Sequence, residues 1–227
     1  MQEPQKIIES ALKEGRATLS EYESKLILSH YRIPVTRESL CNDLNDLKKA
    51  AQEIGYPLVL KGNSPEITHK TESGLIRLNI RNAVEAELAF KEIMAQMSGR
   101  PGAVLVQEMV KGKRELLAGL TRDPQFGPCV LFGLGGIFTE VLEEVSFRIA
   151  PLDKKAALEM MLETKANKML EGIRGMEAAD KNLLADILIQ LGQIGLEQEK
   201  IKEIDINPLI ISGTKPIAVD ALVVLAP

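Results

Sequence analysis

Residues 202–225 read KEIDINPLIISGTKPIAVDALVVL, two apolar runs separated by a short turn. Each run is typical of a β-strand, and Gly213 with Thr214 fits the two-residue turn that joins antiparallel strands. With that turn, residues whose numbers sum to 427 face each other, which places Asn207 opposite Asp220. The pattern therefore predicts a C-terminal hairpin that carries an amide and a carboxylate at one point of its ladder.

The two prolines of this hairpin have different consequences for its pairing. Pro216 falls where no ladder donor is needed, which supports the register, whereas Pro208 falls where a donor is wanted, so we expect pairing to loosen there. Directly opposed residues have Cβ atoms about 4.5–5.5 Å apart, and two hard oxygen ligands suit Mg²⁺ completed by phosphates and water. The alternative is that Asn207 and Asp220 are ordinary polar residues, although an unpaired carboxylate inside apolar runs is costly.

Working outward, helix and strand patterns alternate along the rest of the chain. The KGKR turn between Val110 and Glu115 is the natural boundary, which predicts two α+β lobes, residues 1–109 with the N-terminal helices and residues 110–227. A cleft between two lobes is a common ligand site. Helices are expected near residues 7–15, 20–30, 44–54, 83–97, 154–171 and 181–199. Strands are expected near 34–40, 56–61, 75–80, 103–110, 114–121, 127–135, 146–152, 202–212 and 215–225.

Composition restricts the function classes. The 227 residues are 45% hydrophobic and 26% charged, which is the profile of a folded protein. Aromatic residues make up 4%, and the net charge of −4 includes no basic block, so binding to nucleic acid or an anionic membrane is not indicated. Cys41 and Cys129 show no paired spacing, and the chain has neither a signal pattern nor an apolar run of about 20 residues, so we expect a cytoplasmic protein.

The strand YPLVLK and the loop after it carry two candidate residues. Lys61 ends the strand and could hold a phosphate as a point charge, or it could be a solvated strand end. The loop GNSPEITHKTESG is rich in turn residues and contains His69, whose neutral imidazole could attack phosphorus. A lone loop histidine is also compatible with a simple solvent-facing side chain.

Glycines and carboxylates near the middle of the chain are further candidates. Gly135 and Gly136 in FGLGGIFTE could let the backbone approach a ligand closely, but the segment matches neither the dinucleotide fingerprint nor the P-loop. A bend in the chain is the alternative. Glu115 and Glu140 could aid metal or ribose binding, or could be solvated carboxylates.

Several of these segments occur together in one known family. KGNSPEITHKTESG, VQEMVKGKRELLAGLTRDPQFGP, FGLGGIFTEVL, FRIAPLD and EIDINPL with AVDA resemble the ATP-grasp subunit of NDP-forming acyl-CoA synthetases, from about residue 15 to the C-terminus. The related succinyl-CoA synthetases are similar in the lysine strand and the INPL segment. The resemblance implies an ATP-grasp fold of two α+β lobes with the nucleotide in the cleft between them.

The resemblance also implies roles for individual residues. Lys61 would bind the nucleotide phosphates, and Glu115, Gly135 and Gly136 would also be nucleotide-binding residues. Asn207 and Asp220 would hold Mg²⁺. Glu108, Met109 and Val110 would form the hinge that holds adenine. His69 would be a phosphohistidine that accepts the phosphoryl group from the partner subunit and passes it to ADP.

The resemblance implies that the enzyme is an ADP-forming acetate–CoA ligase, of which this chain would be the β subunit. Its substrates on this chain would be ADP or ATP, and its partner a CoA-binding α subunit, in an expected α2β2 assembly that also uses phosphate. Two alternatives remain at this point: an ATP-grasp carboxylate–amine ligase without a histidine relay, and a nucleotide-sensing subunit that no longer catalyses.

Overall fold

The chain folds into two compact units. The computed structural model describes all residues except 1–2, 65–73, 98–100, 137–144, 173–174 and 227. The larger unit comprises Met1–Leu19, Glu23–Val35 and Val110–Pro227, and the smaller unit comprises Ser20–Tyr22 and Thr36–Met109. The chain therefore leaves the smaller unit between Met109 and Val110, just before the KGKR turn.

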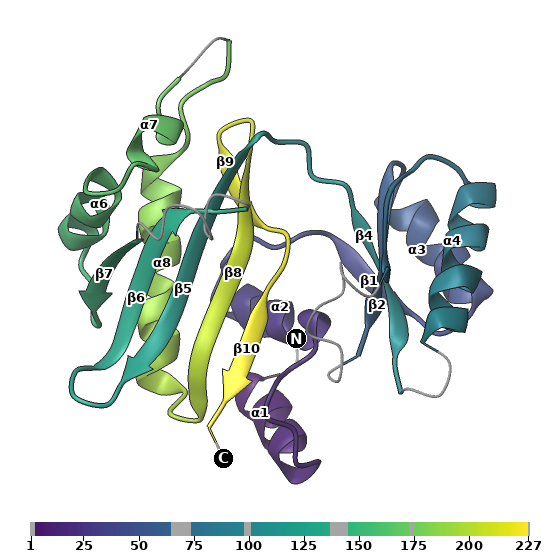
Figure 1. The fold of residues 1–227 in the computed structure, drawn as a ribbon, viewed down its shortest axis with the longest axis horizontal. Helices are drawn as coiled ribbons and strands as arrows, with labels where there is room; N and C mark the ends of the chain where they lie inside the picture. Colours follow the sequence, from purple (N-terminus) through teal and green to yellow (C-terminus); the bar gives the residue numbers. More distant parts are fainter. Residues whose placement is uncertain (1–2, 65–73, 98–100, 137–144, 173–174, 227) are drawn as a thin grey trace. The chain divides into compact units, whose positions relative to one another are not determined.

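The larger unit is built on an antiparallel sheet of six strands (Figure 1). Its strand order is β10-β8-β5-β6-β7, and β9 pairs with β8. Every pairing in it is antiparallel, which is typical of a sheet with one covered and one open face. The strands are β5 (Arg114–Asp123), β6 (Gly127–Leu134), β7 (Val145–Ile149), β8 (Ile201–Ser212), β9 (Lys215–Ala218) and β10 (Leu222–Leu225).

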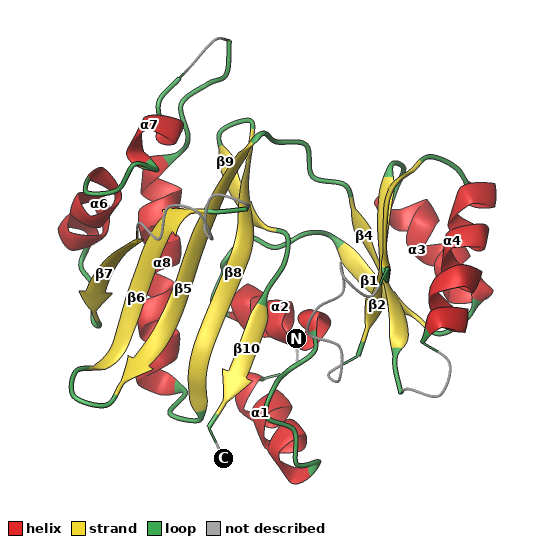
Figure 2. Cartoon of the chain, viewed as in Figure 1, coloured by secondary structure: helices red, strands yellow, loops and turns green. Residues whose placement is uncertain are grey.

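Helices cover one face of this sheet, as Figure 2 shows. They are α6 (Lys154–Leu162) and α8 (Lys181–Glu197). The short helix α7 (Asn167–Leu170) lies between them in the chain, so the single helix expected over residues 154–171 is two short helices. Alternate residues of the central strands, such as Leu116, Ala118 and Leu120 of β5, are fully buried in the core that these helices share. The intervening residues of β5 and β8 lie on the other face.

The N-terminal helices belong mainly to the larger unit, which corrects the expected grouping of residues 1–109. These are α1 (Pro4–Lys13) and most of α2 (Glu21–His30). Ile7 and Ile8 of α1 and Ile27 and Leu28 of α2 are buried in the same core cluster as β5, β6 and β8. The physical reason is that their apolar stripes are covered by that core, whereas sequence order alone placed them with the segment that follows.

The smaller unit is a four-stranded antiparallel sheet in the order β1-β4-β2-β3. The helices of this unit cover one face of the sheet (Figure 2). Its core is a separate cluster that includes Leu58, Leu60, Phe90 and Ile93. The elements are β1 (Glu38–Cys41), α3 (Leu44–Ile54), β2 (Leu58–Asn63), β3 (Ile76–Ile80), α4 (Ala83–Gln96) and β4 (Ala103–Glu108).

The C-terminal hairpin has the predicted register. Leu209 pairs with Ala218 in β8 and β9, and Leu222 pairs with Asp205 in β10 and β8, so residues whose numbers sum to 427 face each other on both sides of a break. The break removes 219–221 from the expected strand 215–225. It lies beside Pro208, whose ring nitrogen carries no hydrogen, and the loosening expected there is confirmed.

Within the described ranges, no helix is both long enough and apolar enough to cross a membrane.

Candidate functional site

Oxygen-bearing side chains gather on the open face of the larger unit's sheet. In β8, Ile204 and Ile206 point into the core, so Asp205 and Asn207 project from the opposite face. Asp220 lies in the break between β9 and β10, where the register brings it to the position facing Asn207. All three polar residues are half-buried. The structure thus supports the predicted proximity of Asn207 and Asp220.

A turn after β6 holds the amide of Asn207. The N–H of Gly136 donates to Oδ1 of Asn207 across 3.0 Å, and the N–H of Gly135 donates to the carbonyl of Glu115 across 3.0 Å. Gly136 has a φ of +64°, and a Cβ placed on it would collide with Oε2 of Glu115. Glu115, Gly136 and Asn207, which are distant in sequence, are therefore in direct contact.

Asp205 is a further candidate site residue, which the sequence analysis did not identify. Burial, together with the neighbouring carboxylates of Glu203 and Asp220, raises the pKa of Asp205 to about 6. Like charges crowded in a partly buried position favour a bound cation or a shared proton. The sequence did contain a signal for Asp205: it lies two residues before Asn207 in the same strand, and alternate residues of a strand share a face.

The donor set on this face suits a hard cation only with help from a ligand. Among the described residues, no group of three His, Cys, Asp or Glu side chains could hold a metal ion by itself. Mg²⁺, however, is commonly bound by one or two carboxylates together with substrate phosphates and water. The amide oxygen of Asn207 and the carboxylate of Asp220 fit that kind of site.

Lys61 lies in the smaller unit and is buried within β2. Its Nζ is 2.7 Å from Oε1 of Glu21, and the two side chains are 5% and 0% exposed. The alternative that Lys61 is a solvated strand end is therefore wrong. Glu21 was not predicted because nothing in the sequence relates a helix residue to a strand residue that follows it at a distance of 40 positions.

The expected hinge segment is fixed by hydrogen bonds inside the smaller unit. The carboxylate of Glu108 accepts from the backbone N–H and the Nε of Arg37, at 2.9 and 3.0 Å. The N–H of Glu108 donates to the carbonyl of Arg37, and that of Met109 to the carbonyl of Pro57. The side chain of Glu108 is thus an anchor for Arg37, and the expected contact of residues 108–110 with adenine stays a prediction.

His69 and Glu140 lie outside the described residues, so the expected roles of both stay predictions.

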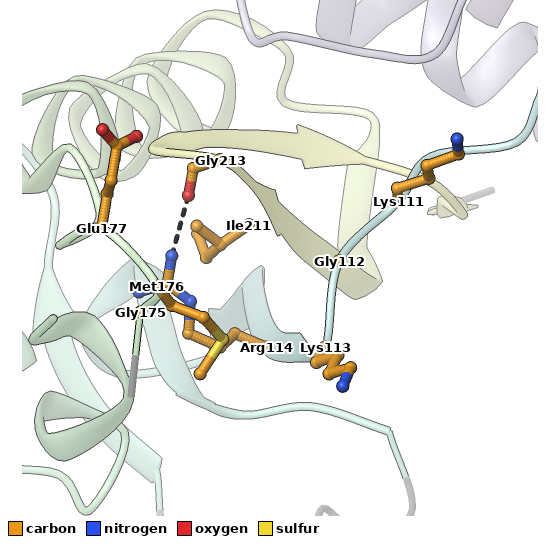
Figure 3. A pocket seen from close by; sticks show the side chains of 9 residues that line it. All are labelled: Lys111, Gly112, Lys113, Arg114, Gly175, Met176, Glu177, Ile211 and Gly213. Carbon is orange, nitrogen blue, oxygen red and sulfur yellow. Dashed lines mark hydrogen bonds between the residues drawn. The ribbon is translucent and has the colours of Figure 1, made fainter. Parts of the chain in front are cut away.

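A pocket of about 750 Å³ opens elsewhere in the larger unit (Figure 3). Arg114 lies in its wall, 5% exposed, and donates to the carbonyls of Met169 and Gly213 at 3.2 and 2.8 Å. This guanidinium ties α7 to the β8–β9 turn, which is a structural role. The pocket contains none of the predicted site residues; it is lined by Lys111, Gly112, Lys113, Arg114, Gly175, Met176, Glu177, Ile211 and Gly213.

Comparison with known proteins gives matches over nearly the full chain. A family model described as an ATP-grasp domain matches residues 10–225. The β subunit of ADP-forming acetate–CoA ligase I from Pyrococcus furiosus is 46% identical over 224 residues, which cover 96% of each chain. The corresponding ligase II subunit from the same organism is 41% identical over 228 residues, which cover 97% of each chain.

Solved structures agree with these sequence matches. The dinucleotide-forming acetyl-coenzyme A synthetase 1 of Ca. Korarchaeum cryptofilum, in complex with coenzyme A, Ca-AMPCP and HgCl⁺, superposes with a TM-score of 0.94 at 41% identity, covering 99% of this chain and 100% of that one. A second structure of that enzyme, with coenzyme A and Mg-AMPPCP, has its phosphohistidine segment pointing towards the nucleotide-binding site. It superposes with a TM-score of 0.88 at 42% identity, over 99% and 100% of the two chains.

Proposed function

Because this chain belongs to the ATP-grasp family of ADP-forming acetate–CoA ligase β subunits, we propose that it is the nucleotide-binding subunit of such a ligase. The reaction converts acetyl-CoA, ADP and phosphate into acetate, CoA and ATP, and it is reversible. The observation that carries this proposal is the match to β subunits of this activity over 96% of both chains. It accords with the α+β ATP-grasp fold expected from the sequence.

Phosphoryl transfer depends on positioning and on neutralising charge. Lys61 binds the nucleotide phosphates as a point charge, while Glu21 holds its ammonium group in place. Asn207 and Asp220 bind Mg²⁺, which when bound would reduce the repulsion between phosphate oxygens. Glu115 binds the nucleotide beside Gly135 and Gly136, and residues 108–110 bind adenine.

His69 carries the phosphoryl group in this proposal. Its imidazole nitrogen attacks the phosphorus of a phosphohistidine on the partner subunit, and the bond from phosphorus to the partner's nitrogen breaks. An oxygen of the β-phosphate of ADP then attacks the same phosphorus, the bond to His69 breaks, and ATP is formed with the neutral imidazole restored.

Chemical labelling tests the relay. After incubation of the assembled enzyme with labelled ATP, wild type should carry acid-labile, base-stable label on this chain, and His69→Ala should carry none. Nucleotide binding should survive in the variant, because the imidazole does not hold ADP. Near wild-type ATP synthesis by His69→Ala would show that no relay passes through this residue. A carboxylate–amine ligase or a nucleotide sensor would form no phosphohistidine in either protein.

The partner in this proposal is a CoA-binding α subunit, in an α2β2 assembly. The relatives from Pyrococcus furiosus that match this chain end to end carry the name of a β subunit, and this chain spans 33% of the Archaeoglobus fulgidus ADP-forming acetate–CoA ligase I. Copurification of a CoA-binding chain in a complex of α2β2 mass supports the assembly, and full turnover by this chain alone contradicts it.

We place the enzyme in the cytoplasm. Cys41 and Cys129 are free thiols, as a reducing compartment maintains them. Recovery of the enzyme in a membrane or secreted fraction would contradict this assignment.

A further inference from the structure

The turn after β6 is built closely against β5. A Cβ on Gly135 would collide with the backbone of Leu116, and a Cβ on Gly136 would collide with the carboxylate of Glu115. The N–H of Gly135 is bonded to the carbonyl of Glu115. Two consecutive glycines are therefore required for the chain to follow this path, which fixes the position of the next N–H, that of Gly136.

That N–H selects one of the two ends of the Asn207 amide. A backbone N–H can only donate, so it pairs with Oδ1 of Asn207 and not with the amide nitrogen. Oδ1 has a second lone pair, which is left for another partner. If the amide were rotated by half a turn, two donors would face each other across the same 3.0 Å.

We propose that Gly136 is a positioning residue for Asn207, which holds the amide with its oxygen available to the metal ion of the bound nucleotide. The inference rests on the proposed function, since it takes Asn207 to be a ligand of Mg²⁺. It assigns to Gly136 a role other than binding the nucleotide directly, because its N–H is already bonded to Asn207. Glu115 supports the arrangement, because its carboxylate occupies the space that a side chain at position 136 would need.

Gly136→Ala tests the inference, with Gly127→Ala as the matched control. Gly127 begins β6 and Gly136 follows its end. Both have positive φ, +77° and +64°, but a Cβ on Gly127 meets nothing within 4 Å. Both variants therefore carry similar backbone strain, and only the new side chain of Gly136→Ala meets the carboxylate of Glu115 and displaces the N–H from Asn207. Outer-shell partners of a metal ligand typically contribute about 10- to 100-fold in metal affinity. We expect the affinity of the full chain for Mg²⁺ in the presence of ADP to fall by that factor in Gly136→Ala alone, measured by competition with Mn²⁺.

Repeating the glycine substitutions in an Asn207→Asp protein distinguishes a loss of amide orientation from general damage to the turn. In Asn207→Asp both terminal atoms are oxygens, so no N–H is needed to select between them. The additional loss caused by Gly136→Ala in that background should shrink to the level of the Gly127→Ala control. An equal loss of Mg²⁺ affinity in both backgrounds would overturn the inference, because the damage would then not act through the amide.

Hydrogen exchange provides a test that does not depend on the folding of Gly136→Ala. Asn207→Ala leaves every backbone atom of the turn in place and removes only the acceptor, so exchange of the Gly136 amide in the metal-free full chain should accelerate. Unchanged exchange overturns the inference. If instead Asn207→Ala accelerates exchange but leaves Mg²⁺ affinity unaltered, the contact is real and the proposed metal site is wrong.

Discussion

Removing the charge of Lys61 should destabilise the protein more than removing one partner of an exposed ion pair would. At an effective dielectric constant of about 20, unit charges at the 2.7 Å separation of Lys61 and Glu21 attract by about 6 kcal/mol. Desolvation of both groups offsets much of this, but deleting one partner removes the attraction from a charge that stays buried, at a cost of about 3–5 kcal/mol. We therefore expect Lys61→Met to lower the free energy of unfolding by that amount.

Two further variants make the experiment discriminating. Replacing both partners, with Glu21→Leu added to Lys61→Met, removes the buried carboxylate as well and should recover most of the stability, while nucleotide affinity stays low. Lys48→Met is the control, because Lys48 and Glu87 form an exposed pair at 3.7 Å with side chains 60% and 36% exposed. Its cost should stay below about 1 kcal/mol.

Glu21→Leu alone completes the set, and urea unfolding followed by far-ultraviolet circular dichroism measures all five proteins, since the chain has no Trp to report by fluorescence. A Lys61→Met variant within about 1 kcal/mol of wild type would refute the reasoning. So would a double variant whose loss equals the sum of the two single losses, because a coupled pair is not additive.

Three further outcomes are expected. Asp220→Ala should raise the barrier to Mg²⁺-dependent turnover by about 2–4 kcal/mol, and unchanged turnover would argue against its assignment. Asp205→Asn should stabilise the metal-free protein by on the order of 1–3 kcal/mol at pH 7. The gain should vanish below the unfolded pKa of 3.8, where the carboxyl of Asp205 is protonated in both states. Between pH 3.8 and about 6 the unfolded state ionises before the native state does, so the wild-type protein loses stability as pH rises. Urea melts in EDTA that show an equal gain at pH 3.5 and 7 would contradict this cause. Gly195→Ala should cost about 1–3 kcal/mol, since its Cβ would lie 2.6 Å from Cβ of Pro128 and 2.8 Å from Cδ1 of Leu120, and an unchanged melting temperature would show that the helix can shift.

The features that the sequence predicted well are those fixed by local geometry. The glycine turn has a set length, so the ladder positions of Asn207 and Asp220 follow from counting. The helix predicted over residues 44–54 has the bounds of α3, because its apolar spacing and its Asp43 cap are both local. The family resemblance rested on several short motifs together, and the full-length match confirms it.

The features that the sequence did not predict are contacts between distant segments. Gly136 and Asn207 are 71 positions apart, and their contact depends on how β5 lies between β6 and β8. Glu21 was visible only as the beginning of a helix. The membership of α1 and α2 in the larger unit depends on which core covers their apolar stripes, and a stripe does not specify its partner.

The smaller unit is joined to the larger one by two adjacent strands. The chain enters it at Thr36 and leaves it at Met109, and β1 pairs with β4, so that Glu38 lies opposite Gln107. Apart from Ser20–Tyr22, the unit is therefore an insertion whose two ends lie together.

This topology has a consequence for synthesis on the ribosome. Residues 36–109 emerge as one continuous segment and can form their sheet early, whereas the larger unit needs both ends of the chain. Thr18 bridges to Val224, and Val35 bridges to Ala218. Because domains generally fold as units during translation, we expect the inserted unit to be complete first, while the N-terminal helices remain without their core until the last strands have left the exit tunnel.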